Sequence, residues 1–167
     1  MSRLDSAIRR LQAQKLSLEW AVSAIPDRSG NAIELGLGNG RTFDHLRSLM
    51  PDRPFYVFDR QIAAHPDCIP AADRIFLGDF RDTLVAARRA LGQTVLLAHL
   101  DIGTGEKDAS IALAAQIAPL VDDLLADGAV VVSDQPVSLP RWSRARLPDG
   151  IKPGRIHQCG HQGRGCS

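Results

Sequence analysis

Apolar residues along the chain follow two alternating spacings, which predict strands alternating with helices. Short apolar runs, typical of buried strands, occur at residues 32–33, 55–58, 75–77, 94–100 and 129–132. Spacings of three and four residues predict intervening helices at residues 41–50, 82–91 and 108–127. Strands that alternate with helices favour a doubly wound α/β fold with a mostly parallel sheet and right-handed crossovers.

The N-terminal segment has the pattern of a long amphipathic helix. Residues 4–24 place apolar side chains on one helical face, and Pro26 ends the pattern. Ser2 and Asp5 are suitable caps for its start. We expect this helix to pack on the sheet or on a partner subunit.

Prolines and turn residues set the remaining boundaries. Pro66 and Pro70 predict a short or broken crossover before the third strand, and Pro119 predicts that the helix at 108–127 is split in two. Near the end, residues 144–147 and 155–159 flank a turn-rich loop, which predicts an antiparallel hairpin at one sheet edge. We therefore predict a single domain over residues 1–167, with the helix and turn at 1–30, a core at 31–160 and a frayed tail at 161–167.

Composition and charge bear on which partners the protein binds and on where in the cell it is found. The chain has 167 residues and a net charge of +1, so charge gives no general basis for binding nucleic acid. Basic residues gather in the C-terminal part, where a solvated surface is favoured over a locally basic rim: Arg141, Arg144, Arg146, Lys152, Arg155 and Arg164. No apolar run approaches membrane-spanning length, the N-terminus lacks the apolar core of a signal peptide, and three cysteines indicate free thiols. We expect a cytoplasmic protein with neither nucleic-acid nor membrane partners.

A glycine turn follows the first strand. Gly36, Gly38 and Gly40 alternate with other residues and lead into the helix at 41–50. Glycine suits positions of positive φ, or positions where the backbone must lie against a ligand. A helix N-terminus also presents unpaired N–H groups. The turn therefore predicts a ligand-binding site.

Acidic residues stand at the ends of successive strands, where open α/β sheets bind ligands. They are Glu34, Asp59, Asp79 and Asp101, with Asp134 near the end of the fifth strand. Asp59 comes about 20 residues after the glycines, the spacing of a carboxylate that accepts hydrogen bonds from ribose hydroxyls.

The other acids fit further parts of a nucleoside ligand. Asp79 could accept from an adenine amino group, with Phe80 or Ile62 against the ring. Glu34 and Asp101 could hold an ammonium group. Because the turn has no lysine, the site suits a ligand that carries positive charge rather than phosphates.

The Gly-x-Gly-x-Gly turn, with an acid two residues before it, resembles motif I of the class I (Rossmann-like) S-adenosylmethionine-dependent methyltransferases. Residues 55–59, 77–80, 96–101 and 124–133 resemble that family's later motifs, and the terminal hairpin resembles its reversed strand pair. The likeness covers roughly residues 32–159. The chain also resembles a small group of short bacterial proteins described only as methyltransferases of this kind.

The resemblance implies a seven-stranded sheet of order 3-2-1-4-5-7-6 and S-adenosyl-L-methionine as the cofactor. The cofactor-binding residues that it implies are Glu34, Gly36, Leu37, Gly38, Asn39, Gly40, Thr42, Asp59, Arg60, Asp79, Phe80 and Asp101. It also implies in-line methyl transfer to an acceptor that the sequence does not identify. Because the chain is short, we expect a small-molecule acceptor, an externally presented acceptor or a pocket completed by a second subunit. The last option leaves a homodimer or higher homo-oligomer open. A non-catalytic cofactor-binding protein and a nicotinamide-dependent oxidoreductase are the alternatives.

Two residues are candidates for catalysis. His99 and Asp101 share one face of the fourth strand, near its end, where they could meet the methyl group and the acceptor. A hydrogen-bonded core histidine is the alternative interpretation of His99. His45 and His65 are the other histidines of this region, and His65, which precedes Pro66 in a loop, is more typical of a structural or surface position.

Metal binding is a weaker alternative, and we predict no metal site. Asp101 with Asp134 and Gln135 loosely resembles the magnesium ligands of catechol-type methyltransferases. The residue types that bind zinc recur near the end of the chain, at His157, Cys159, His161 and Cys166.

Overall fold

A seven-stranded sheet of order β3-β2-β1-β4-β5-β7-β6 forms the centre of the computed structural model, which describes residues 2–163. The strands are β1 (Asn31–Leu35), β2 (Phe55–Asp59), β3 (Ile75–Leu77), β4 (Val95–Leu100), β5 (Leu125–Ser133), β6 (Trp142–Arg144) and β7 (His157–His161). The first five are parallel, whereas β7 runs antiparallel to both β5 and β6. The predicted doubly wound order and the reversed strand pair are confirmed.

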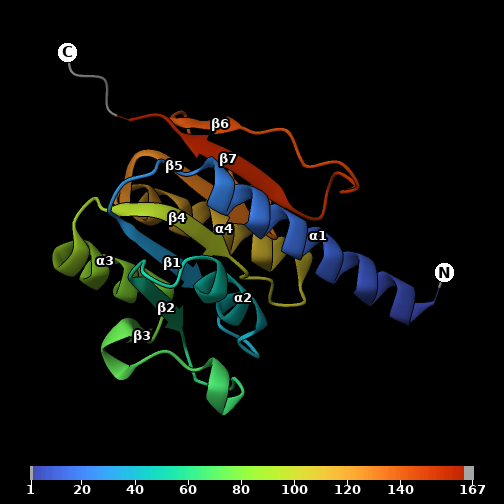
Figure 1. The fold of residues 1–167 in the computed structure, drawn as a ribbon, viewed down its shortest axis with the longest axis horizontal. Helices are drawn as coiled ribbons and strands as arrows, with labels where there is room; N and C mark the ends of the chain where they lie inside the picture. The colour runs from blue at the N-terminus through green and yellow to red at the C-terminus, as the bar shows by residue number, and fades with distance from the viewer. Residues whose placement is uncertain (1, 164–167) are drawn as a thin grey trace.

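Helices cover both faces of this sheet (Figure 1). They are α1 (Arg3–Ala24), α2 (Arg41–Leu49), α3 (Phe80–Leu91) and α4 (Lys107–Asp122). Side chains of α1 and α2 share one apolar cluster with the sheet, and side chains of α3 and α4 share the other. All six residues of β4 are buried between these layers, which explains its uninterrupted apolar run.

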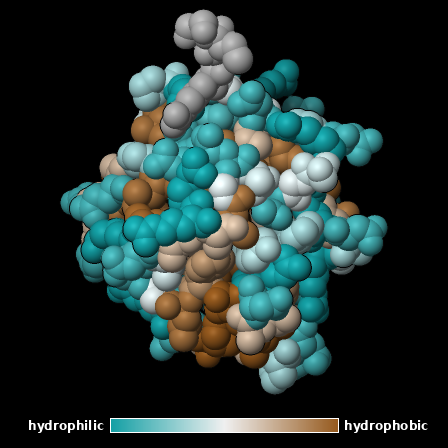
Figure 2. All heavy atoms as spheres, turned by 90° about the vertical axis from the view of Figure 1, so that its left-hand side faces the viewer, coloured by the Kyte–Doolittle hydropathy of each residue, from teal (hydrophilic) through white to brown (hydrophobic). Residues whose placement is uncertain are grey.

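The crossover between β2 and β3 contains only two 3₁₀ turns, η1 (Pro66–Cys68) and η2 (Ala72–Arg74). This agrees with the short, broken crossover that the two prolines predict. On that edge of the sheet Leu77 is 61% exposed, and Val85 of the neighbouring α3 is 41% exposed. Figure 2 views this side of the molecule and shows hydrophobic atoms gathered over part of it.

Helix α1 has a capped N-terminus, and its C-terminal half is more deeply buried than its N-terminal half. The Ser2 hydroxyl accepts from the Asp5 backbone N–H, while the Asp5 carboxylate accepts from the Ser2 backbone N–H. Leu18 is buried toward the C-terminal half, but Leu4 and Ile8 stay exposed. The first half of α1 extends beyond the carboxyl ends of the parallel strands (Figure 1). A partner subunit against this half stays a prediction.

The prediction that Pro119 splits a helix at 108–127 is wrong. Helix α4 runs unbroken from Lys107 to Asp122 with Pro119 inside it. The lost backbone hydrogen bond lies within one turn of the helix end, and Ile117 and Val121 on either side are fully buried in the core. Packing therefore keeps this last turn helical. Strand β5 begins at Leu125, four residues before the predicted start at residue 129.

The hairpin strands also differ from the predicted ranges of 144–147 and 155–159. They shift to Trp142–Arg144 and His157–His161 because Trp142 and His161 have buried partners. The Trp142 Nε1–H donates to Asp122 over 2.8 Å, and His161 Nδ1 lies 3.1 Å from the carbonyl oxygen of Ala126. His161 is therefore a strand residue and not the start of a frayed tail. Residues 164–167 of that predicted tail lie outside the described residues.

Candidate active site

The glycine turn lies against the end of β4. Gly36, Gly38 and Gly40 all have positive φ, at 87°, 52° and 83°. A Cβ atom at Gly36 would overlap the carbonyl oxygen of Asp101. Glycine at this position is therefore required by the contact between two strand ends, whatever the turn binds.

Gly38 has different surroundings. A Cβ atom built there would meet no atom within 4 Å, whereas one at Gly40 would lie 2.5 Å from the Cβ of Cys68. The protein itself leaves open space beside Gly38. At this point of the turn a ligand could lie directly against the backbone.

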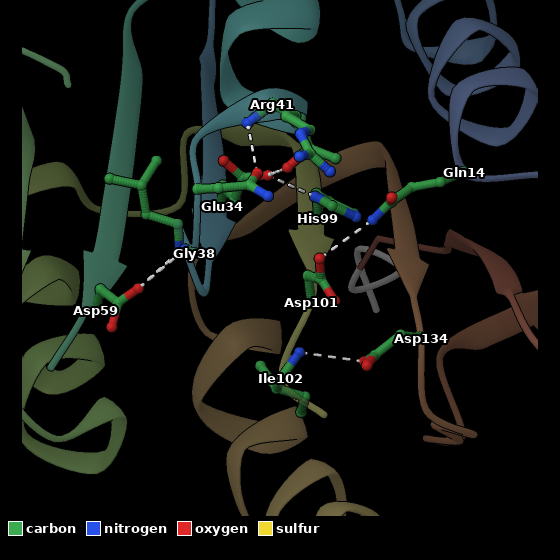
Figure 3. Close-up of polar contacts among 12 residues, drawn as sticks. Gln14, Glu34, Gly38, Arg41, Asp59, His99, Asp101, Ile102 and Asp134 are labelled. Carbon is green, nitrogen blue, oxygen red and sulfur yellow. Dashed lines mark hydrogen bonds and ion pairs between the residues drawn. The ribbon is translucent and has the colours of Figure 1, made fainter. Parts of the chain in front are cut away.

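The Asp59 carboxylate joins this turn to the end of β2 (Figure 3). Its Oδ2 accepts from the backbone N–H groups of Leu37 and Gly38, over 2.8 Å and 3.3 Å. Its Oδ1 accepts from the N–H groups of Arg60 and Gln61, over 2.7 Å and 3.3 Å. Two of these four bonds are long, so the carboxylate retains some capacity to accept hydrogen bonds from a ligand.

Asp79 caps α3 at the same edge of the sheet. Its Oδ1 accepts from the Arg81 backbone N–H over 2.9 Å, and its Oδ2 lies 3.1 Å from Nη2 of Arg60. The backbone hydrogen bond from Arg81 is the main cause that lowers the pKa of Asp79, and the two arginines add to it. Phe80 is only 9% exposed and packs in the core under α3, so little of its ring is open to a ligand.

A buried polar cluster lies behind the turn. Glu34 is fully buried, and its Oε1 accepts from the Thr42 hydroxyl and lies 2.8 Å from Nδ1 of His99. Its second oxygen, Oε2, is buried without a hydrogen-bond partner among residues 2–163. A buried carboxylate oxygen without a donor is costly, so this atom is suited to meet a donor from a ligand.

The His99 ring is 2% exposed. Burial alone would lower the pKa of His99, but the hydrogen bond and charge of Glu34, aided by Asp101 and Asp134, raise it above the ordinary value. These contacts favour the core-histidine interpretation over a base that meets an acceptor directly. The other two histidines lie outside this cluster. His45 Nε2 is 3.7 Å from Glu19 Oε1, and His65 caps η1.

Asp101 and Asp134 lie beyond this cluster, at the ends of β4 and β5 (Figure 3). Asp101 is exposed, and its Oδ2 accepts from Nε2 of Gln14 in α1 over 3.1 Å. Asp134 accepts from the backbone N–H groups of Ile102 and Gly103, over 3.1 Å and 2.9 Å, and from Nε2 of Gln135. Burial is the main cause that raises the pKa of Asp134.

A cavity of about 620 Å³ opens beside these two acids. Its lining comes from α1, from the start of α4 and from the segment that leads into β7: Arg10, Gln14, Asp101, Lys107, Ile111, Asp134, Gln135, Pro136, Gly154, Arg155, Ile156 and His157. No motif or spacing in the sequence marks Arg10, Gln14 or Lys107 as site residues. On a helix surface, polar residues that face a cavity have the same pattern as polar residues that face solvent.

The residues weighed as alternative metal ligands have other surroundings. Asp134 uses both carboxylate oxygens for N–H donors, Cys159 is buried in the core with a pKa raised by burial, and His161 lies 3.3 Å from Asp122. Within residues 2–163, no three His, Cys, Asp or Glu side chains are grouped so that they could hold a metal ion. Cys166 lies outside the described residues.

The structure thus brings most of the predicted residues to one edge of the sheet. Asn39 Oδ1 accepts from the Arg41 N–H at the start of α2, over 3.2 Å, and helps to shape the turn. Phe80 is the exception, since its side chain points into the core. Over the part of the chain that is described, no helix has both the length and the apolar character needed to cross a membrane.

Comparisons with known proteins agree with this geometry. A model of a family described as S-adenosyl-L-methionine methyltransferase matches residues 1–158. The crystal structure of an S-adenosyl-L-methionine methyl transferase from Silicibacter pomeroyi is 38% identical, with a TM-score of 0.91, and the match covers 96% of this chain and 99% of that one. A search of curated proteins gave no significant match.

More distant structures share the fold alone. Human methyltransferase-like protein 13, crystallised with SAH, is 13% identical with a TM-score of 0.55, over 96% of this chain and 82% of that one. A protein-(glutamine-N5) methyltransferase from Alicyclobacillus acidocaldarius is 14% identical with a TM-score of 0.54, over 90% of this chain and 93% of that one.

Proposed function

The chain belongs to the family of S-adenosyl-L-methionine methyltransferases, and on this premise we propose that it methylates a small molecule bound in the cavity beside Asp101. The cavity carries this proposal. Its volume of about 620 Å³ lies within the usual range for small-molecule sites, roughly 300–1,000 Å³. Two of its lining residues, Gln14 and Asp134, lie on the other side of Asp101 from Gly38 and Asp59 (Figure 3).

We assign the cofactor to the turn itself. The open space at Gly38 leaves room for a ligand against the backbone, and the unpartnered Oε2 of Glu34 suits a positively charged donor. Asp59 and Asp79 extend this anionic edge toward β2 and β3, where we propose contacts with ribose and adenine. Leu37, Asn39, Gly40, Thr42 and Arg60 complete the proposed cofactor contacts, through the turn and the residues beside it.

When bound, the cofactor supplies an electrophilic methyl group on a sulfonium. The protein's part in an in-line displacement is alignment and exclusion of water. The hydrogen bond from Gln14 to Asp101 holds α1 across the cavity, and Asp101 is the exposed acid where the two parts of the site meet. We propose that Asp101 orients the acceptor, while buried His99 fixes the Glu34 carboxylate.

Cofactor binding tests the assignment of the turn. Isothermal titration with S-adenosylhomocysteine should give saturable binding, and Gly38→Ala should weaken it by about tenfold or more because the new Cβ occupies the open space. Gly150→Ala is the matched control, since Gly150 also has positive φ and an empty Cβ position but lies outside the turn. Equal binding by wild type and Gly38→Ala would refute this assignment.

Acceptor turnover tests the rest of the proposal. With saturating cofactor, formation of S-adenosylhomocysteine should depend on a small molecule in an acceptor panel, and Asp101→Asn should reduce the rate about tenfold or more. His99→Ala should keep turnover if its cofactor binding is intact, because the ring is buried. Methylation confined to protein or nucleic-acid acceptors would overturn the small-molecule assignment.

A further inference from the structure

We propose that the acceptor carries an oxyanion, either a carboxylate or a phosphate, and that Arg10 and Arg155 bind it at the rim of the cavity beside Asp101. The inference rests on the proposed function, since it concerns the acceptor end of the same site. The observations that carry it are the charges around this cavity and the lack of internal partners for those charges.

Basic side chains from three separate segments line the cavity. Arg10 comes from α1, Lys107 is the first residue of α4, and Arg155 precedes β7. No carboxylate among residues 2–163 forms an ion pair with any of these three. All three residues are exposed, and no ion pair within the described structure offsets their positive charge, so it remains available to attract an anionic ligand.

Three of the arginines that do form ion pairs show the contrast. Arg47 pairs with Asp44, Arg60 with Asp79, and Arg141 with Asp122. Within residues 2–163, the Arg155 side chain instead makes only a long hydrogen bond, 3.5 Å from Nη2 to the Ser6 hydroxyl. Because guanidinium groups bind carboxylate and phosphate oxygens through paired N–H donors, two such groups at one rim favour an oxyanion.

The geometry of α1 fixes the place of this anion. Arg10 and Gln14 are four residues apart, so they lie on the same helix face, and Gln14 Nε2 reaches Asp101 over 3.1 Å. One turn of helix separates them, which is a rise of about 6 Å along the axis. Arg10 is therefore one turn nearer the N-terminus than Gln14, within the first half of α1.

The two acids of the cavity lining, Asp101 and Asp134, give the acceptor one orientation. Asp101 and Asp134 repel an anion, although three N–H donors partly offset the charge of Asp134. His157 adds little charge, because burial, together with the nearby Arg144, lowers its pKa. The anionic end of the acceptor is thus favoured at the rim, and its methyl-accepting end is directed toward Asp101.

NMR titrations of the protein saturated with S-adenosylhomocysteine test this proposal, with inorganic phosphate and acetate as probes. We expect saturable shifts of the backbone amides of Arg10, Lys107 and Arg155 with at least one probe. Arg10→Gln and Arg155→Gln should each weaken that binding about fivefold or more. Arg3→Gln is the control, because Arg3 lies on the same helix but does not line this cavity.

The outcomes separate the two proposals. If all variants bind S-adenosylhomocysteine normally but phosphate and acetate bind equally well to wild type, Arg10→Gln and Arg155→Gln, the oxyanion proposal is refuted and the ions are adventitious. If wild type does not bind S-adenosylhomocysteine, the proposed function itself fails. The probe that binds more tightly indicates whether the acceptor carries a carboxylate or a phosphate.

Discussion

His99 Nδ1 lies 2.8 Å from Glu34 Oε1, across the register pair that joins β4 to β1. Both side chains are buried, and the Thr42 hydroxyl donates to the same carboxylate oxygen. The contact links the two strand ends that carry the glycine turn and Asp101. It therefore couples the shape of the proposed cofactor site to the stability of the central sheet.

Removing the imidazole should destabilise the protein. His99→Ala leaves a buried carboxylate without its histidine partner, and loss of one partner of a buried pair typically costs about 3–5 kcal/mol. In a Glu34→Gln background the same substitution should cost less, because no buried charge is then left unpaired. Urea unfolding of the four proteins measures both costs, and equal costs in the two backgrounds would contradict a coupled pair.

Stability should also depend on pH through His99. Its folded pKa is raised above the ordinary value of 6.5, so its contribution to stability is fully present below that value and is lost as the pH rises through the folded pKa. The difference in unfolding free energy between wild type and His99→Gln should therefore shrink as the pH rises above the ordinary histidine pKa of about 6.5. A difference that is constant or grows with pH would show that His99 is not protonated in the folded protein.

Two glycines of the turn should respond differently to alanine. Gly36→Ala places a Cβ against the Asp101 carbonyl and should cost about 3 kcal/mol or more, since the backbone of one strand end must move. Gly38→Ala meets no atom and should cost only the strain of its positive φ, about 1–2 kcal/mol. Urea unfolding midpoints measure both losses of stability. A larger loss of stability for Gly38→Ala than for Gly36→Ala would contradict this prediction.

The stability of the β6–β7 hairpin should depend on the Asp122 carboxylate. Asp122 accepts from Trp142 Nε1–H and pairs with Arg141, and His161 Nε2 lies 3.3 Å away. Asp122→Ala should lower the free energy of unfolding by about 3 kcal/mol and speed hydrogen exchange of the β6 and β7 amides. Asp149→Ala, which removes an exposed pair with Arg146, is the control and should leave exchange in these strands unchanged.

Local pattern predicted most of the fold. The buried run of β4 and the glycine turn have signals within a few residues, because strand burial and positive φ are local requirements. The limits of the hairpin depend instead on Asp122, about 20 residues before Trp142 along the chain. Neither Trp142 nor His161 carries a local mark of that contact, so the predicted strands were displaced along the chain.

The candidate site likewise contains residues that could be predicted from the sequence and residues that could not. The acids that follow strands, such as Asp59 and Asp101, could be predicted because the parallel topology brings strand ends together. Gln14 lies 87 residues before Asp101, on a helix whose polar face is typical of a solvated surface. Only the path of α1 past the sheet shows that this face lines a cavity.

The position of α1 would therefore select acceptors by length. Gln14 contacts Asp101, and Arg10 lies one helical turn away on the same helix. An acceptor must then hold its anionic group and its methylated atom at a matching separation. Moving the arginine along the same face, by Arg10→Ala with Ala7→Arg or Ser6→Arg, should favour acceptors that are longer by about one turn, roughly 5 Å.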